Sequence, residues 1–281
     1  MKKLFIIIGL TGVILSMCAQ STQNPFYSEY DTPFGVPPFS EIEEQHYLPA
    51  FKSGIEQQDQ EIKAITSSEE APTFDNTIVA MERSGDLLTK VSNVFYNLTS
   101  AHTNDKMQEI AREVAPMLSA HRDNILLNAD LFERVKAVYD GRESLDLTAE
   151  QNRLVEEYYK MFERGGANLN DADKQELREI NERLSLLSVQ FGENVLKENN
   201  RFEMVIDDQA DLAGLPEGQI NAAAEAAEER GHANKWVFTL HKPSLIPFLQ
   251  YSEKRDLREK MLKAYINRGN HDDDLDNKDI A

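Results

Sequence analysis

Residues 171–199 read DADKQELREINERLSLLSVQFGENVLKEN. The large apolar side chains in this stretch recur at alternating steps of three and four positions, which places them on one face of an α-helix. They are Leu177, Ile180, Leu184, Leu187 and Phe191. Charged residues fill the other faces. The pattern predicts one long amphipathic helix that packs inward as an antiparallel partner in a helix bundle, with an apolar seam too short for a coiled coil.

Helical spacing recurs on both sides of this stretch. One helix is expected to begin at Ser40, where Glu43 would complete a capping box, and a second is expected to begin at residues 72–75. Further helices are expected over residues 104–127, 129–139, 148–162, 217–230, 244–250 and 253–267.

Two short runs break the helical pattern. Residues 202–206 (FEMVI) and 236–240 (WVFTL) are rich in aromatic and β-branched side chains, which predicts strands. A predicted helix lies between them, so they would form a small sheet patch. The predicted fold class is therefore mostly α, a multi-helix lobe with a small β-strand patch. The glycine motifs of dinucleotide-binding domains and of P-loops are absent from the sequence, which gives no support to nucleotide binding.

The charge of the chain limits its partners. The chain has 281 residues, of which 41% are hydrophobic, and this is enough for a sizeable core in one large or two modest domains. Its formal net charge is −19. So large an acidic excess repels phosphate groups, which argues against nucleic acid and against electrostatic docking on an anionic membrane.

The N-terminal residues are typical of an export signal. Lys2 and Lys3 precede an apolar stretch, residues 4–15, that is too short to span a bilayer as a mature helix. Cys18, the single cysteine of the chain, follows after Ser16 and Met17. This arrangement resembles a bacterial lipoprotein signal, in which the cysteine is acylated and becomes the new N-terminus, although Met17 stands where a small residue is usual.

We therefore expect residues 1–18 to be a signal peptide of the lipoprotein type, with Cys18 as the lipid attachment site. Ordinary cleavage or a retained anchor are the alternatives. The body would be exported to the periplasm or cell envelope and would contact the membrane through the lipid anchor at most. Residues 19–38 are polar and rich in proline, which predicts an extended tether. Residues 39–281 are expected to form the helical body.

No catalytic or metal-binding residue can be assigned from local motifs. None of the six histidines begins the zinc motif H-E-x-x-H, and the serine hydrolase motif G-x-S-x-G is absent. His271-Asp272-Asp273-Asp274 is the best local metal candidate, but its spacing matches neither an EF-hand nor a zinc site. We interpret it as an acidic turn that precedes a helix. His241, beside a predicted strand end, is interpreted as a structural histidine.

Several groups of residues occur together in the order and spacing of a known family. They are PAFKSGI at 49–55, PTFDNTI at 72–78, ERSG at 82–85, FERGGA at 162–167, and the stretches 184–194 and 236–277. Over residues 24–281 the chain resembles the N-terminal part of the thimet oligopeptidase family. Within that family it is most similar to the bacterial peptidyl-dipeptidases.

The resemblance implies a zinc metallopeptidase that removes C-terminal dipeptides from short peptides. It implies a mostly helical, two-lobed ellipsoid divided by a deep channel, of which residues 39–281 would form one wall. The motif H-E-x-x-H, a later glutamate ligand and one zinc ion would belong to the second lobe, beyond Ala281. We therefore expect this chain to be truncated before the catalytic lobe, to be inactive alone and to expose apolar surface where that lobe packs.

Two alternatives remain open. The full-length protein could be an oligopeptidase of the same family that cuts internally. The chain could also be a complete, non-catalytic helical lobe that binds partners at the cell surface. Continuation of the reading frame into H-E-x-x-H would separate the enzyme from the binding lobe.

Overall fold

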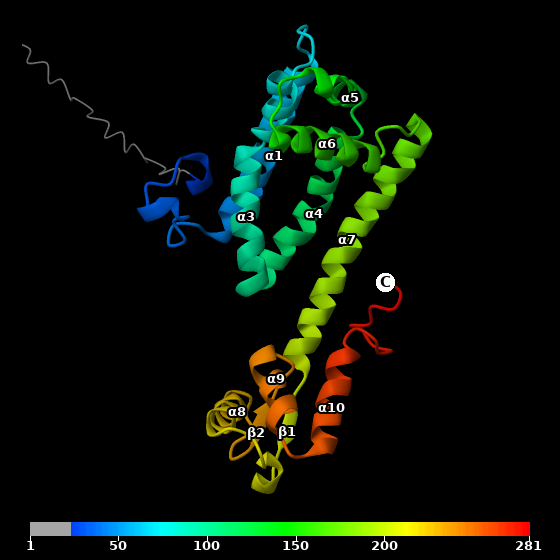
Figure 1. The fold of residues 1–281 in the computed structure, drawn as a ribbon. Helices are drawn as coiled ribbons and strands as arrows, with labels where there is room; N and C mark the ends of the chain where they lie inside the picture. The colour runs from blue at the N-terminus through cyan, green and yellow to red at the C-terminus, as the bar shows by residue number, and fades with distance from the viewer. Residues whose placement is uncertain (1–23) are drawn as a thin grey trace, which may run out of the picture.

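The computed structural model describes residues 24–281, in which the long helix α7 (Asp171–Arg201) joins two groups of elements (Figure 1). The N-terminal group contains α1 (Glu44–Thr66), η3 (Phe74–Val79), α2 (Ala80–Glu82), α3 (Asp86–Ala101), α4 (Asp105–Leu126), α5 (Ala129–Gly141), η4 (Arg142–Ser144) and α6 (Ala149–Arg164). The C-terminal group contains β1 (Met204–Ile206), η5 (Gln209–Leu212), α8 (Glu217–Glu229), β2 (Trp236–Phe238), α9 (Lys242–Tyr251) and α10 (Arg255–Ile266). The predicted mostly α fold with a small β patch is confirmed.

Polar side chains cap most of the predicted helix starts. Asn104, Asn128 and Asn170 each accept a hydrogen bond from the backbone N–H three residues further on. Thr148 and Gln151 form a reciprocal capping box at the start of α6. These bonds satisfy N–H groups that have no partner inside the helix. The starts of α4, α5, α6 and α7 therefore lie close to their predicted positions.

Helix α1 begins later than the sequence predicts, at Glu44 rather than Ser40. The N–H of Glu41 donates to the carbonyl of Pro38, so the chain turns tightly before the helix. Glu43 is the cap, and the Nδ1 atom of His46 accepts a hydrogen bond from its N–H at 3.0 Å. A histidine thus occupies the position where a capping box usually has Glu or Gln. The predicted start at Ser40 is wrong for this reason.

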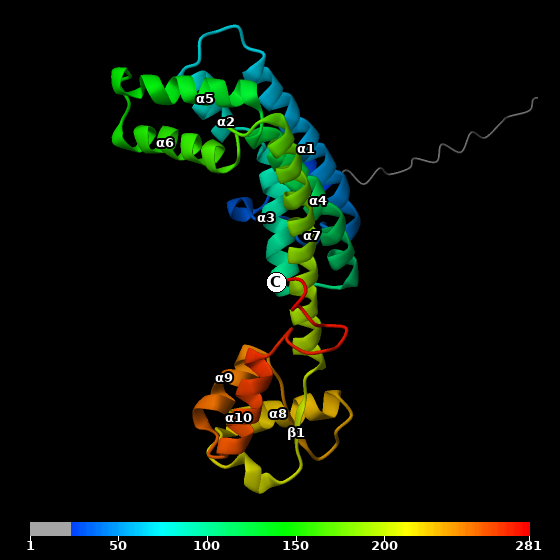
Figure 2. The ribbon, with the colours of Figure 1, turned by 90° about the vertical axis from the view of Figure 1, so that its right-hand side faces the viewer.

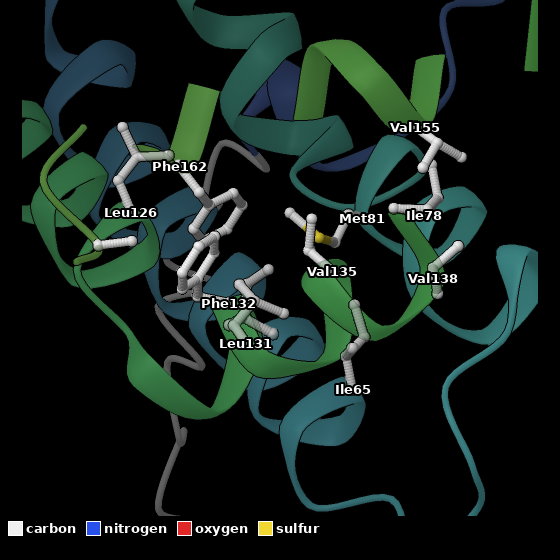
Figure 3. Close-up of a cluster of buried hydrophobic side chains, with 12 residues drawn as sticks. Ile65, Ile78, Met81, Leu126, Leu131, Phe132, Val135, Val138, Val155 and Phe162 are labelled. Atoms are coloured by element: carbon white, nitrogen blue, oxygen red, sulfur yellow. The ribbon is translucent and has the colours of Figure 1, made fainter. Parts of the chain in front are cut away.

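One of three buried apolar clusters lies between α5, α6 and the η3–α2 segment (Figure 3). The rings of Phe132 and Phe162 stack with their centroids 5.9 Å apart. Leu131 and Val135 are fully buried beside them. The cluster joins α5 and α6 into a hairpin that sits at one end of the N-terminal group (Figure 2).

The other two clusters hold the remaining elements together. Between α1, α3 and α4, Phe51 meets Phe95 edge to face at a centroid distance of 5.3 Å. In the C-terminal group, β1 and β2 pair antiparallel, with Met204 opposite Phe238. These two side chains lie on the inner face of the sheet, where they are buried with Phe248 of α9.

Residues 24–27 differ from the extended tether that the sequence predicts. They include the short 3-10 helix η1 (Pro25–Tyr27), in which Phe26 is 1% exposed and packs against Tyr47. The Nδ2 atom of Asn24 donates to the carbonyl of His46 at 2.8 Å. A second 3-10 helix, η2 (Pro33–Gly35), follows. One aromatic side chain is enough to fix this segment on the bundle, because burying it removes a large apolar area from water.

The apolar seam predicted on α7 is only partly covered by the bundle, since Leu177 packs beside Gly166 while other members stay exposed. Leu184 is 53% exposed, Ile180 is 47% exposed and Phe191 is 41% exposed. Helix α7 lies along α4, and polar contacts join the two helices beside this apolar groove (Figures 1 and 2). Asn181 donates to Asp123 at 2.8 Å, and Arg178 donates to Asn124 at 2.9 Å. The helix is confirmed, but the prediction that its whole apolar seam packs inward is wrong, because three of the five side chains are largely exposed.

Candidate functional site

The predicted lipid attachment site, Cys18, lies outside the described residues, as does the predicted signal peptide 1–18. Among residues 24–281, no helix is long and apolar enough to cross a membrane. The assignments of residues 1–18 to a signal and 39–281 to a truncated helical region stay predictions. Of the tether predicted at 19–38, the part from residue 24 onward contains the two short 3-10 helices described above.

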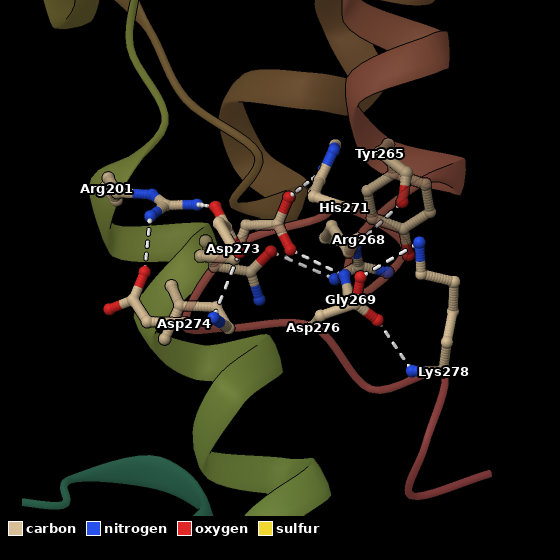
Figure 4. Close-up of polar contacts among 12 residues, drawn as sticks. Arg201, Tyr265, Arg268, Gly269, His271, Asp273, Asp274, Asp276 and Lys278 are labelled. Atoms are coloured by element: carbon tan, nitrogen blue, oxygen red, sulfur yellow. Dashed lines mark hydrogen bonds and ion pairs between the residues drawn. The ribbon is translucent and has the colours of Figure 1, made fainter.

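The predicted metal candidate, residues 271–274, lies against the C-terminal end of α7 (Figure 4). The carboxylate of Glu198, which is 6% exposed, lies at the centre of this contact. One of its oxygens lies 2.6 Å from Nε2 of His271, and the other accepts the N–H of Gly269 at 2.5 Å. We call this arrangement the Glu198 clamp.

Two asparagines extend the clamp along α7. Asn194 donates to the Oδ1 atom of Asn277 at 2.9 Å, and Asn277 donates to the carbonyl of Phe191 at 3.2 Å. Gly269 has a φ angle of +69°, and a Cβ atom there would lie 2.7 Å from the Asn277 side chain. A glycine is required at this position on both grounds. The clamp therefore fixes residues 267–281 to the helix.

The aspartates of the candidate are held by basic side chains. Asp273 lies 2.6 Å from Arg201, and Asp272 lies 2.6 Å from Lys278. The hydrogen bond from Arg201, followed by one from the N–H of Leu275, lowers the pKa of Asp273. Hydrogen bonds to Asp272 and then Asp276 raise the pKa of Lys278.

These contacts support the interpretation of residues 271–274 as an acidic turn, but residues 275–281 do not contain the helix expected to follow it. No three metal-binding side chains converge anywhere in the described part of the chain. The histidine and the aspartates that could have served as ligands are directed at other side chains. The residues present therefore do not fit a zinc ion. His241, predicted to be structural, is the exposed N-cap residue of α9.

A second feature is a set of three hollows that share the side chain of Arg122 as part of their lining. Their volumes are about 550, 470 and 300 Å³. The largest lies between α4 and α7, and the smallest lies between α1, α2, α4 and α6. Arg164 also lines the two larger hollows. We call the whole feature the Arg122 hollow.

The smallest cavity of the Arg122 hollow has apolar walls and a polar floor. Its walls include Ile62, Met81, Leu118, Ile125 and Met161. The floor is a chain of hydrogen bonds through Gln58, Ser84 and His121. Such a combination of apolar walls and a few fixed polar groups is typical of ligand pockets.

The hydrogen bonds of the floor fix its orientation. Ser84 donates to the carbonyl of Met81 and accepts from Nε2 of Gln58 at 3.1 Å. The Oε1 atom of Gln58 therefore faces Nε2 of His121, 2.7 Å away, and this nitrogen must be the donor. The Nδ1 atom of the buried His121 lies 3.0 Å from a carboxylate oxygen of Asp59, but out of line for a hydrogen bond.

Sequence reasoning did not single out this hollow. Arg122, Arg164 and His121 lie at ordinary helical positions, and nothing local marks them. The FERGGA stretch gave the one available signal. Gly165 lies so close to α4 that a Cβ atom there would be 3.0 Å from Leu126, so the glycine allows α6 and α4 to meet beside Arg122.

The comparisons with known proteins agree with the resemblance. The chain is 40% identical to dipeptidyl carboxypeptidase of Escherichia coli over 260 residues, which are 92% of the chain and 38% of that protein. It is 32% identical to oligopeptidase A of Haemophilus influenzae over 83% of the chain and 34% of the relative. It is 28% identical to the organellar oligopeptidase A of Arabidopsis thaliana over 92% of the chain and 33% of the relative. No family model matches the chain.

The chain thus belongs with the N-terminal part of the thimet oligopeptidase family, as the sequence predicts. It spans between 33% and 38% of the length of these relatives.

Proposed function

We propose that this chain is the N-terminal portion of a zinc metallopeptidase that removes C-terminal dipeptides from short peptides. The observation that carries the proposal is the 40% identity to a dipeptidyl carboxypeptidase over 92% of the chain. In the proposed enzyme one zinc ion is bound by residues outside the part that this chain matches, because the described residues offer no converging ligands.

In this proposal the chain contributes one wall of a substrate channel. Helices α4 and α7 lie side by side, and the groove between them is the largest part of the Arg122 hollow. The exposed apolar seam of α7 supports the presence of a further packing partner, since single apolar side chains are common on surfaces but a helical row of them is not. The wall excludes folded proteins by its bulk and admits short, unfolded peptides.

A chimeric enzyme tests the proposal. Residues 24–281 would replace the matching N-terminal part of the Escherichia coli dipeptidyl carboxypeptidase, and dipeptide release from blocked tetrapeptides would be measured with and without a metal chelator. We expect a chimera that releases dipeptides and loses this activity with the chelator. The unmodified relative and its remaining part alone are the controls. A folded chimera that releases no dipeptide would contradict the proposal.

The two alternatives give different outcomes. An internally cutting oligopeptidase would be shown if the full-length protein yields products that arise from cleavage within blocked substrates. A non-catalytic binding lobe would give an inactive chimera and a reading frame without H-E-x-x-H. The 32% identity to an oligopeptidase A supports the first alternative, the internally cutting oligopeptidase.

We further propose export and lipid anchoring at Cys18, supported by the basic and apolar residues that precede it. The protein would then lie in the periplasm or cell envelope. Labelling cells with a radioactive fatty acid is expected to mark the protein, and Cys18→Ser is expected to abolish the label. Label on the Cys18→Ser variant would show that the lipid is attached to another residue.

A further inference from the structure

The Arg122 hollow holds two arginines that have no acidic partner. Neither Arg122 nor Arg164 forms an ion pair or a side-chain hydrogen bond with any of residues 24–281. Other basic side chains among residues 24–281, such as Arg183 and Arg255, lack a partner too, but they do not line the hollow. Both arginines line the same two cavities.

The other charged groups of the hollow are already engaged. Glu157 lies 2.7 Å from Arg153, and Lys160 lies 2.5 Å from Glu156. The buried Asp123 accepts a hydrogen bond from Asn181. The two free guanidinium groups are therefore the charges available to a ligand, and planar guanidinium groups match a carboxylate with two parallel hydrogen bonds.

The apolar cavity adjoins these charges directly, because Arg122 lines it as well. A volume of about 300 Å³ suits one or two apolar side chains. The hydrogen-bonded floor of Gln58, Ser84 and His121 holds the cavity open, since each of these groups is directed at another protein atom.

We propose that the Arg122 hollow binds the free carboxylate end of a short peptide whose last residue is apolar. Arg122 and Arg164 hold the carboxylate, and the last side chain enters the cavity between Met81, Leu118 and Met161. The identity of the ligand as a peptide rests on the proposed function. The positions of the charges and of the cavity do not depend on the proposed function.

Calorimetric titration of the whole chain tests this. The probes are the acetylated tetrapeptide Ala-Ala-Ala-Leu with a free C-terminus, the same peptide amidated, and the free peptide that ends in Ser. We expect the free Leu peptide to bind, and amidation to weaken binding at least about tenfold because it removes a charge-assisted pair. The Ser peptide is expected to bind more weakly than the Leu peptide.

Substitutions locate the site. Arg122→Gln and Arg164→Gln are expected to weaken binding of the free peptide to the level of the amide. Arg183→Gln, at an exposed arginine of α7 outside the hollow, is the matched control and should leave binding unchanged. Arg122 and Arg164 are exposed, so the fold should survive, and thermal melting checks this.

Each contrary result overturns the proposal. Equal binding of the amide excludes the carboxylate, and unchanged binding in Arg122→Gln excludes the site. Binding of an amidated peptide with an internal Glu would point to acidic side chains instead. No binding at millimolar peptide, combined with an active chimera, would reject this site and leave the proposed peptidase function intact. Binding combined with an inactive chimera would support this site and reject the proposed peptidase function.

Discussion

Glu198 and Gly269 are 71 positions apart in the sequence, yet a carboxylate oxygen of the first accepts the N–H of the second at 2.5 Å in a buried contact. The other carboxylate oxygen meets His271 (Figure 4). Two donors thus converge on one anion, and both lose their partner if the anion is removed.

Glu198→Gln is expected to loosen residues 267–281 by about 1–3 kcal/mol, because an amide has one acceptor oxygen and cannot serve both donors. Hydrogen exchange of the Gly269 amide should become faster, while exchange in α1 and α3 stays the same. Glu182→Gln, at an exposed position of the same helix, is the control. Unchanged exchange at Gly269 would show that the clamp does not hold this segment.

Truncation of Leu131 and Leu184 to Ala should separate buried from exposed leucines. Leu131 is fully buried, so Leu131→Ala is expected to lower the free energy of unfolding by about 2–5 kcal/mol. Leu184 is 53% exposed, so Leu184→Ala is expected to change it by less than about 0.5 kcal/mol. Urea denaturation measures both. A large loss in Leu184→Ala would mean that the seam of α7 is covered.

The ionisation of Tyr47 is expected to be displaced to high pH. Burial, followed by the nearby charges of Glu44 and Tyr30, raises the pKa of Tyr47 from 10.0 to about 12. The neutral phenol is favoured in the fold, so its contribution to stability is complete below pH 10 and is lost as the pH rises toward 12. The difference in ultraviolet absorbance between the chain and Tyr47→Phe measures this titration. A transition near pH 10 in the folded chain would contradict it.

Gly85→Ala is expected to disturb the floor of the Arg122 hollow. Gly85 has a φ angle of +76°, and a Cβ atom there would lie 2.5 Å from the amide of Gln58. Strain in the backbone and displacement of Gln58 should together cost about 1 kcal/mol or more. The chemical shifts of the His121 ring should change with it. Gly218→Ala, at an open position in α8, is the control and should be neutral or stabilising.

Much of the fold could be predicted because it depends on local patterns. Helix α6 begins after Thr148, where the sequence places it, because Thr148 and Gln151 cap it through their own side chains. The same reasoning failed at Ser40, where a histidine three residues after the true cap replaced the expected glutamate. Capping rules of this kind list common residues, and His46 is not among them.

Which face of a helix is apolar and which element that face contacts are separate questions. Periodicity identified the apolar seam of α7, but periodicity carries no information about what that seam meets. The contact with α4 depends also on Asn181 and Arg178, for which the sequence pattern predicts a solvent-facing position.

Long-range contacts explain the remaining differences. Residues 271–274 could be read as a metal site or as an acidic turn, and the deciding partners, Glu198 and Arg201, lie about 70 positions away. Arg122 and Arg164 likewise became a candidate site only when α4, α6 and α7 were placed together. Local sequence cannot show which charges lack a partner.

Helix α7 has 31 residues and is therefore about 46 Å long. It is bound to α4 at Asn181 and again at Glu193, which pairs with Arg112, and its last turns carry the Glu198 clamp. The stretch from Asn181 to Glu198 is about 26 Å long, so a tilt of about 5° of the helix on α4 would carry Glu198 through about 2 Å. A small change of packing near Asn181 therefore becomes a larger displacement at Glu198. The angle between α7 and α4 sets the position of the C-terminal elements that follow α7.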